Sequence, residues 1–184
     1  VYISGNSHYF RLREEINAEL FGELAVGNIY ELEHEFLDIE TRSEGSKTKA
    51  KSITEHAIRS VDTFPNKRLI IHYIAPHHPY VGPAAEDFFG EGSNNQPPTL
   101  FSKIRRGEID IDDRLLETFY REEIKRVIPF VENLLETLPG KTVVSADHGE
   151  LLGDQVSPIP VKEYGHHDRL YVDELVKVPW HISH

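Results

Sequence analysis

The dipeptide Asp147-His148 places a carboxylate next to an imidazole, directly after the short apolar run TVVSA at residues 142–146. Carboxylate oxygen and imidazole nitrogen are both ligands for divalent ions, and these side chains are short, so ordering them costs little conformational entropy. Gly149 follows and permits a close turn of the backbone. We therefore predict that Asp147 and His148 bind a metal ion. The alternative is an ordinary turn after a strand, with His148 exposed.

A second candidate is the histidine pair His77-His78, which lies between Pro76 and Pro79 after the apolar run LIIHYIA at residues 69–75. The two prolines restrict the backbone on either side. An imidazole held in this way can meet an anionic oxygen without a further ordering cost. Because adjacent side chains of an extended segment point in opposite directions, we expect the two histidines to differ in role and one of them to be structural.

A third cluster, YGHHDR at residues 164–169, contains His166 and His167 ahead of a segment that can start a helix. These two histidines either have a binding role or belong to ordinary solvated polar surface. Solvated surface is the stronger alternative for His167. Five other histidines are expected in the core or exposed, without a chemical role: His34, His56, His72, His181 and His184. The carboxylates of residues 117–123 recur at helical spacing and are expected to face water, so we assign them no chemistry.

Two apolar runs are expected to position these candidates. Residues 69–75 and 142–146 are short and rich in branched side chains, which is typical of strands buried on both faces. Between them, Asp112 can cap a helix whose apolar residues recur every three or four positions until Pro139. Pro129 removes one backbone donor inside this helix and should bend it or split it.

The order strand, helix, strand predicts a parallel crossover, because parallel neighbours need a long connection. Residues 2–4 and 178–182 can supply further strands, and residues 52–62 a further helix. We therefore predict an α/β fold, a layered sandwich with a mostly parallel central sheet. Ligand sites in open sheets of this kind lie at the carboxyl ends of strands, which is where Asp147 stands in the sequence.

The composition limits both the organisation of the chain and its partners. The 184 residues include 20 Lys plus Arg against 31 Asp plus Glu, a formal net charge of −11, and neither Cys nor Met. We expect a single domain over residues 1–184. Without cysteine the chain has no disulfide and no thiolate ligand for a metal. The acidic balance argues against a nucleic-acid partner, and no run is apolar enough for a membrane segment.

In chain order, the motifs PHHPY, SADHGE and YGHHDRLYVDELVKVPW resemble the later part of the sulfatase-like branch of the alkaline phosphatase superfamily. The resemblance covers residues 69–182. It implies an alkaline-phosphatase-like α/β fold and hydrolysis of an anionic, small-molecule phosphate or sulfate ester at a divalent metal ion. Where an alcohol replaces water as acceptor, it implies transfer of a phospho group.

The resemblance also implies roles for individual residues. His77 matches a histidine that contacts the ester, with Ala75 standing where the family often has Asp. Asp147 and His148 match the motif that completes the metal site. His166 matches a residue that contacts the bound ester. On this basis His77 and His166 are the candidate catalytic and substrate-binding residues, and both can donate a hydrogen bond to the ester oxygens or a proton to the leaving group.

The family's Cys, Ser or Thr nucleophile and its amino-terminal metal-binding carboxylates lie upstream of the first strand matched here, so the nucleophile is not placed. The opening residues 2–8 resemble the strand that follows the nucleophile helix, which implies that His8 also binds substrate. We therefore expect a fragment that lacks its first strand and nucleophile helix, with the cytoplasm as the favoured location and the oligomeric state open.

The metal ion is expected to be manganese, zinc or calcium. His148, which stands where other members of the family carry Asn, favours manganese or zinc, because imidazole suits those ions and calcium prefers oxygen ligands. That preference also favours phosphate over sulfate esters. Two alternatives stay open at this point: a catalytically inactive relative that binds an anion, and a purely structural acidic domain that binds no metal.

Overall fold

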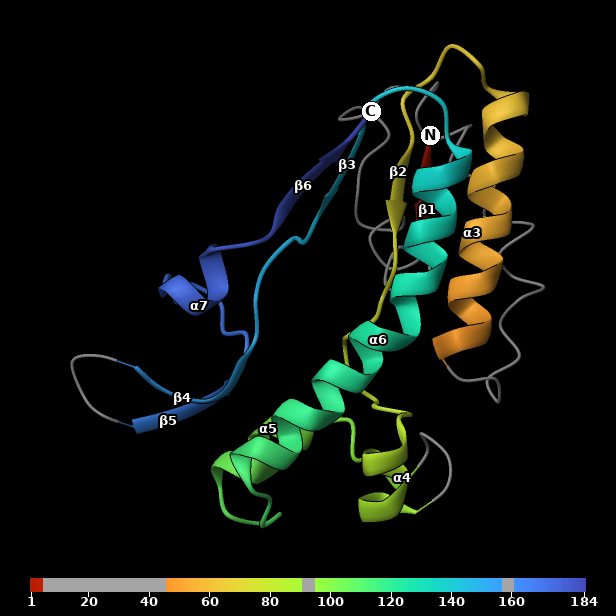
Figure 1. Ribbon diagram of the computed structural model, residues 1–184. Helices are drawn as coiled ribbons and strands as arrows, with labels where there is room; N and C mark the ends of the chain where they lie inside the picture. Colours follow the sequence, from red (N-terminus) through yellow and green to blue (C-terminus); the bar gives the residue numbers. More distant parts are fainter. Residues whose placement is uncertain (5–45, 91–94, 157–160) are drawn as a thin grey trace, which may run out of the picture. The chain divides into compact units, whose positions relative to one another are not determined.

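The computed structural model describes residues 1–4, 46–90, 95–156 and 161–184. The chain forms two compact units, whose helices and strands are labelled in Figure 1. Unit 1 consists of Val1–His77 and Ile124–Leu138, and unit 2 consists of His78–Glu123 and Pro139–His184. The expectation of a single domain stays a prediction. Within the described ranges, no helix has the length and apolar character needed to cross a membrane.

Unit 1 is built on two parallel strands and a helix. β1 (Tyr2–Ser4) pairs with β2 (Ile70–His72), and Ile3 lies opposite Ile71. α3 (Ser46–Thr63) comes between the two strands in the chain, and Figure 1 shows it in orange beside them. Parallel neighbours need a connection of this kind. The predicted strand at residues 2–4 and the predicted helix at residues 52–62 are confirmed.

An apolar face of α3 packs against the strand pair. Ala50, Ile53 and Ala57 are buried and follow one another at intervals of three or four residues, which places them on one side of the helix. Ile53 and Ala57 cluster with Ile3 of β1 and with Leu134. Complete burial of an Ile or Leu side chain contributes roughly 1.5–3 kcal/mol, so this cluster holds α3 against β1 and β2.

The predicted long helix is present as α6 (Asp113–Thr137), one element of 25 residues that contributes to both units. Asp112 caps it: its Oδ1 accepts a hydrogen bond from the backbone N–H of Arg114 at 2.8 Å. The helix is not split at Pro129. A proline inside a helix costs about 3 kcal/mol, and buried side chains on either side of it, Phe119 before and Leu134 after, outweigh that cost.

Unit 2 has an aromatic and aliphatic core between short helices and a hairpin. Its helices are α4 (Pro83–Phe89), α5 (Leu100–Arg105), the first part of α6 and α7 (Asp173–Val176). Tyr80, Leu100, Leu116, Phe119 and Tyr164 are all buried and form one cluster. The ring of Phe119 lies 5.8 Å from that of Tyr80, centroid to centroid. Phe119 is thus at the centre of the packing that joins α6 to the segment after Pro79.

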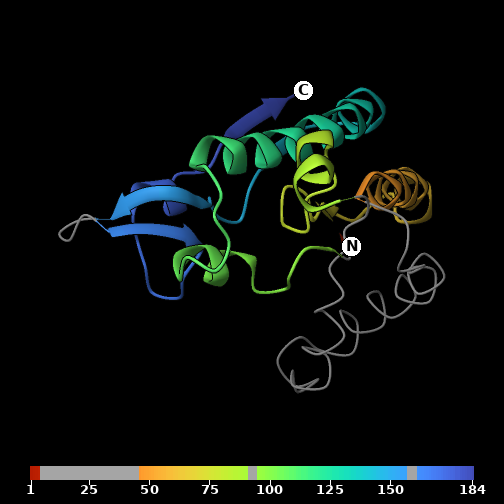
Figure 2. The ribbon, with the colours of Figure 1, turned by 90° about the horizontal axis from the view of Figure 1, so that it is seen from below.

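The strands of unit 2 form two antiparallel pairs. β3 (Thr142–Ser145) pairs with β6 (Trp180–Ser183), and β4 (Leu151–Val156) pairs with β5 (Val161–Gly165). In the second pair Leu151 lies opposite Gly165, and the register shifts between Leu152 and Asp154. Figure 2 shows α5 beside the β4–β5 pair. The predicted strand near residues 178–182 is confirmed, whereas the β4–β5 pair was not predicted.

The prediction of a sandwich with a mostly parallel central sheet is wrong for the described residues. They form three sheets of two strands each, and only the β1–β2 pair is parallel. β2 and β3, expected as parallel neighbours across α6, pair instead with β1 and β6. An apolar run indicates that a segment is extended, but both parallel and antiparallel ladders satisfy its backbone groups. The run itself therefore does not select the partner strand.

The expectation that β2 and β3 are buried on both faces is also wrong. Ile70 of β2 is 61% exposed, and Val143 of β3 is 40% exposed. Residues of β3 alternate between exposed and half-buried along the strand. This alternation is typical of an antiparallel pair with one covered face, in which successive side chains point to opposite sides.

Tyr164 links β5 to the start of α6 and gives the fold a measurable pH dependence. Its hydroxyl donates a hydrogen bond to Asp113 Oδ1 at 2.8 Å, and Lys162 binds the same carboxylate. Burial, reinforced by the hydrogen bond to Asp113 and by its negative charge, raises the pKa of Tyr164 to about 12. The pKa of a tyrosine in an unfolded chain is about 10. The folded state therefore holds this proton more tightly.

We expect the stability contributed by Tyr164 to be complete below about pH 10 and to be lost as the pH rises towards about 12. Tyr164→Phe should lower the free energy of unfolding by about 1–2 kcal/mol at pH 8, because a hydrogen bond to a carboxylate is lost. This difference should shrink above pH 10. Urea midpoints between pH 8 and pH 11 measure it, with Tyr171→Phe, at a residue 80% exposed, as the control. A pH-independent difference would contradict the assignment.

Candidate functional site

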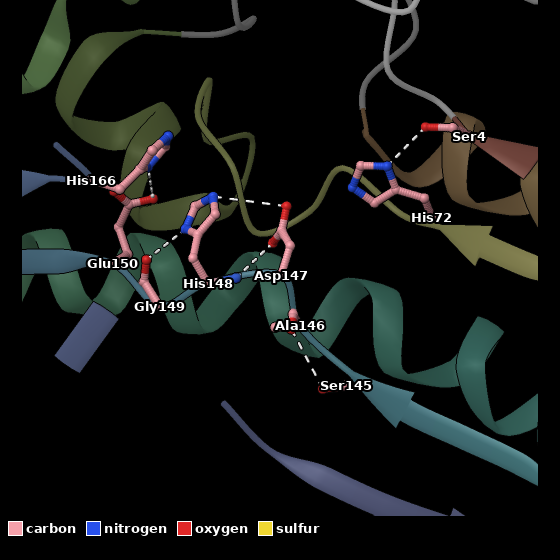
Figure 3. A network of polar contacts seen from close by, with 9 residues as sticks. All are labelled: Ser4, His72, Ser145, Ala146, Asp147, His148, Gly149, Glu150 and His166. Atoms are coloured by element: carbon pink, nitrogen blue, oxygen red, sulfur yellow. Dashed lines mark hydrogen bonds and ion pairs between the residues drawn. The ribbon is translucent and has the colours of Figure 1, made fainter. Parts of the chain in front are cut away.

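Residues 145–150 run from the end of β3 to the start of β4 (Figure 3), and a backbone contact with α7 holds them in place. The N–H of Gly149 donates a hydrogen bond to the Leu175 carbonyl at 2.8 Å. A Cβ at position 149 would lie 1.9 Å from the carbonyl oxygen of Glu174. Only glycine allows the two backbones to approach this closely. The turn that carries the predicted metal ligands is therefore fixed against α7.

The two predicted metal ligands lie side by side in this turn. His148 Nε2 is 3.8 Å from Asp147 Oδ2, and Asp147 Oδ1 accepts a hydrogen bond from the backbone N–H of His148 at 3.0 Å. His148 Nδ1 lies 2.7 Å from the Gly149 carbonyl oxygen. A carbonyl oxygen can only accept, so Nδ1 carries the proton and Nε2 has the lone pair in the neutral ring. The Asp147 side chain is 70% exposed.

The predicted ester-contacting residue His166 lies next to this pair. The His148 and His166 rings are 4.1 Å apart, centroid to centroid, with their planes at 40°. His166 Nδ1 lies 3.0 Å from Glu150 Oε1. This meeting follows from the register of the β4–β5 hairpin, because Glu150 and His166 are the positions just beyond the paired residues Leu151 and Gly165. The structure thus brings together Asp147, His148 and His166, as Figure 3 shows.

Glu150 is the functional candidate that sequence analysis missed. Its side chain is only 6% exposed, although that of its partner His166 is 41% exposed. Burial, followed by the negative charge of Glu150, raises the pKa of both Tyr80 and Tyr120. The carboxylate therefore lies in a partly apolar environment where an imidazole donor compensates its loss of water. In the sequence, Glu150 is the last residue of SADHGE, and no local pattern connects it to His166, sixteen positions later.

The segment after His77 is held by polar side chains from elsewhere in unit 2. The Gln96 side-chain amide accepts a hydrogen bond from the Tyr80 N–H at 2.9 Å and donates one to the Tyr80 carbonyl. His78 Nε2 donates to the Pro98 carbonyl at 3.2 Å, and its ring packs against Phe101. These contacts make His78 part of the packing of unit 2, and the expectation that one of the two histidines is structural stays a prediction.

Glu123 corrects one expectation about the carboxylates of α6. This residue is fully buried, and its Oε1 accepts a hydrogen bond from the Val81 N–H at 2.7 Å, so it does not face water. The helical pattern contains a signal for this, because Glu123 falls at the three-to-four-residue spacing of the apolar positions Phe119 and Val127. A carboxylate on the apolar face of a helix must find a donor, and the backbone of the Tyr80–Val81 segment supplies it.

The remaining candidates are placed as follows. His77 is the last residue of unit 1, so its proposed role stays a prediction. His8 lies outside the described residues. His167 Nε2 lies 3.2 Å from Glu163 Oε2 and 3.2 Å from Arg105 Nη1, which makes it part of a polar cluster between β5 and α5. His72 Nδ1 contacts the Ser4 hydroxyl at 2.9 Å, across the β1–β2 pair (Figure 3).

The donor set of the described residues is incomplete for a metal ion. Asp147 and His148 offer two ligand atoms, but no group of three or more His, Asp or Glu side chains is arranged to hold an ion within the described part of the chain. Two ligand atoms of one ion, each about 2.1 Å from the metal, lie about 3.0–3.4 Å apart. The separation of 3.8 Å between His148 Nε2 and Asp147 Oδ2 is within a small side-chain movement of that value.

Comparison of this chain with protein families, with curated proteins and with solved structures gave no match. The resemblance to sulfatase-like enzymes therefore rests on the three motifs and on the residues that carry them.

Proposed function

We propose that this protein is a divalent-metal-dependent hydrolase of phosphate or sulfate esters, with Asp147 and His148 as two of the metal ligands. The observation that carries the proposal is the pairing of the Asp147 carboxylate with His148 Nε2 at 3.8 Å, on a turn fixed by backbone contacts. Together with the order of the three motifs, this pairing favours a site over an ordinary turn.

The chemistry of His148 supports a role as a metal ligand. A metal-binding imidazole must be neutral and usually donates its other N–H to a carbonyl or carboxylate, which fixes its orientation. His148 has such a partner, because Nδ1 donates to the Gly149 carbonyl while Nε2 lies on the side of Asp147. A nitrogen ligand favours manganese or zinc over calcium. The ligands that complete the centre are expected among the upstream carboxylates that the family resemblance implies.

Ester hydrolysis also needs a group that contacts the ester oxygens or assists the leaving alcohol, and a residue beside this pair would supply it. When bound, the ion would neutralise charge on the ester oxygens and lower the pKa of a hydroxyl nucleophile. The ring of His166 lies against that of His148, so we propose that His166 would contact an ester held at the same place. It would donate a hydrogen bond to the ester or assist the leaving alcohol. The family resemblance implies an ester-contacting role for His77 as well. Water as the final acceptor makes the protein a hydrolase, and an alcohol as acceptor makes it a phospho-group transferase.

Metal analysis of the full-length protein, combined with an ester assay, tests the proposal. The protein should contain about one equivalent or more of a divalent ion and should hydrolyse p-nitrophenyl phosphate or p-nitrophenyl sulfate. Dialysis against a chelator should lower kcat/KM at least about 100-fold, and Mn²⁺ or Zn²⁺ should restore it. A metal-free protein that is indifferent to chelator would refute the site. Bound metal without hydrolysis of either ester would instead favour an inactive, anion-binding relative.

A further inference from the structure

We propose that Glu150 is a positioning residue for His166: its carboxylate keeps the imidazole proton on Nδ1 and turns Nε2 towards the bound ester. This inference rests on the proposed function, because it assigns the supporting partner of a histidine in that same site. It adds a residue that neither the motifs nor the spacing of the sequence had identified.

The geometry of the pair shows which side chain orients the other. His166 Nδ1 lies 3.0 Å from one oxygen of Glu150 and 3.3 Å from the other. The His166 side chain is 41% exposed, so in the absence of a partner its ring could rotate in water. The Glu150 side chain is 6% exposed, at the end of a strand whose register is set by the β4–β5 hairpin. The buried group is therefore the fixed one, and it orients the exposed group.

The hydrogen-bonding chemistry of the two groups determines which atom donates. An ionised carboxylate can only accept hydrogen bonds, so His166 Nδ1 must be the donor. A neutral imidazole has one N–H, and its location on Nδ1 leaves the lone pair on Nε2. The contact thus selects a tautomer as well as a ring orientation. Carboxylates that act on a histidine in this way are a recurrent feature of catalytic and metal-binding sites.

The two stacked rings donate to different kinds of acceptor. Both His148 and His166 use Nδ1 as the donor, but His148 donates to the neutral carbonyl of Gly149 and His166 to a carboxylate. A hydrogen bond to an ionised carboxylate is stronger than one to a neutral carbonyl, because the acceptor is charged. Glu150 therefore restrains the His166 ring more firmly than the Gly149 carbonyl restrains the His148 ring.

Glu150→Gln tests the inference, because glutamine has nearly the same volume but presents either an acceptor or a donor to Nδ1. The chain offers a matched control in Glu163→Gln, which alters a second glutamate–histidine contact of 3.2 Å, with His167, in the same unit. Two readouts are needed: steady-state kinetics with the aryl esters, and the ¹⁵N chemical shifts of the His166 ring. The His166 signals are assigned by their absence in His166→Asn.

We expect Glu150→Gln to lower kcat about 10–100-fold while KM changes less than about threefold, as is typical when the partner of a site histidine is removed. The ¹⁵N shifts should change from a single Nδ1–H tautomer to a mixture. Glu163→Gln should leave both readouts as in the unsubstituted protein. Equal urea midpoints for the two variants would confirm that the loss of turnover is not a loss of folding.

The results separate this inference from the proposed function. If the unsubstituted protein hydrolyses the esters and Glu150→Gln retains its kcat, the positioning role is refuted and the proposed function stands. If the unsubstituted protein is inactive, the proposed function fails, and the ¹⁵N shifts still decide the role of Glu150. An Nε2–H tautomer in the unsubstituted protein, or shifts unchanged in Glu150→Gln, would refute that role.

Discussion

Asp147→Asn is expected to abolish metal binding and ester hydrolysis together. Asparagine keeps the size of the side chain and a carbonyl oxygen that can still accept the His148 N–H, but it lacks the negative charge that binds a cation. We expect kcat/KM to fall at least about 10³-fold, which corresponds to roughly 4 kcal/mol of transition-state stabilisation. Metal content, measured by elemental analysis of the purified variant, should fall in parallel.

Asp173→Asn is the matched control for this substitution. The Asp173 side chain is 68% exposed, close to the 70% of Asp147, and it forms an ion pair with Lys177 one helical turn away. The same change of charge there should leave metal content and kcat/KM within about twofold, because an exposed ion pair contributes little. Because Asp147 is exposed, neither variant should unfold. Full activity of Asp147→Asn would refute the assignment of the metal site.

Phe119→Ala is expected to have the largest effect on stability. The side chain of Phe119 is fully buried, and its ring lies within about 6 Å of those of Tyr80, Phe88 and Phe89. Truncation of a buried phenylalanine costs about 3–5 kcal/mol, because burial is lost and a cavity remains. That is a large share of the roughly 5–15 kcal/mol by which domains are stable. Thermal unfolding should show a decrease in Tm of about 10 °C.

Phe88→Ala separates core packing from a general effect of removing an aromatic ring. Phe88 contacts Phe119 but is 41% exposed, so its truncation leaves space that water can enter. We expect a loss of less than about 1.5 kcal/mol for this variant. Urea denaturation of both proteins provides the comparison. Equal losses for Phe88→Ala and Phe119→Ala would mean that Phe119 is not the centre of the unit 2 core.

Several elements could be predicted because their signals are local. The start of α6 depends on the Asp112 side chain and the N–H two residues later, and its length depends on an apolar spacing of three to four residues. Strands β1, β2, β3 and β6 coincide with short apolar runs. In each of these cases the groups that interact are within a few residues of one another, so that the order of side chains contains the information.

The pairing of strands could not be predicted in the same way. An apolar run has unsatisfied backbone groups on both sides, and many partners at different distances along the chain can satisfy them. β3 has its partner β6 some forty residues later, and the turn against α7 lies between them in the chain. The predicted mostly parallel sheet assumed that strands separated by one helix are neighbours, and the described residues do not follow that rule.

In the candidate site, too, the contact between neighbours in the chain could be predicted and the contact between distant residues could not. Asp147 and His148 are adjacent in the chain, so their type and order were enough to propose a pair of ligands. Glu150 and His166 meet only because the hairpin register places them at equivalent positions on two strands. Their contact depends on how β4 and β5 pair, and no residue pattern within either strand encodes it.

By itself, the sequence determined the side-chain types that can do chemistry, the local capping and spacing that define α6, and the exclusion of thiolate chemistry. The tertiary structure decided which strands pair and which carboxylate contacts His166. It also placed the backbone of α7 so close to Gly149 that no other residue fits there. The physical reason is the range of the interactions. Helix caps and helical periodicity act over a few residues, whereas strand pairing and side-chain burial bring together groups that the order of the chain keeps apart.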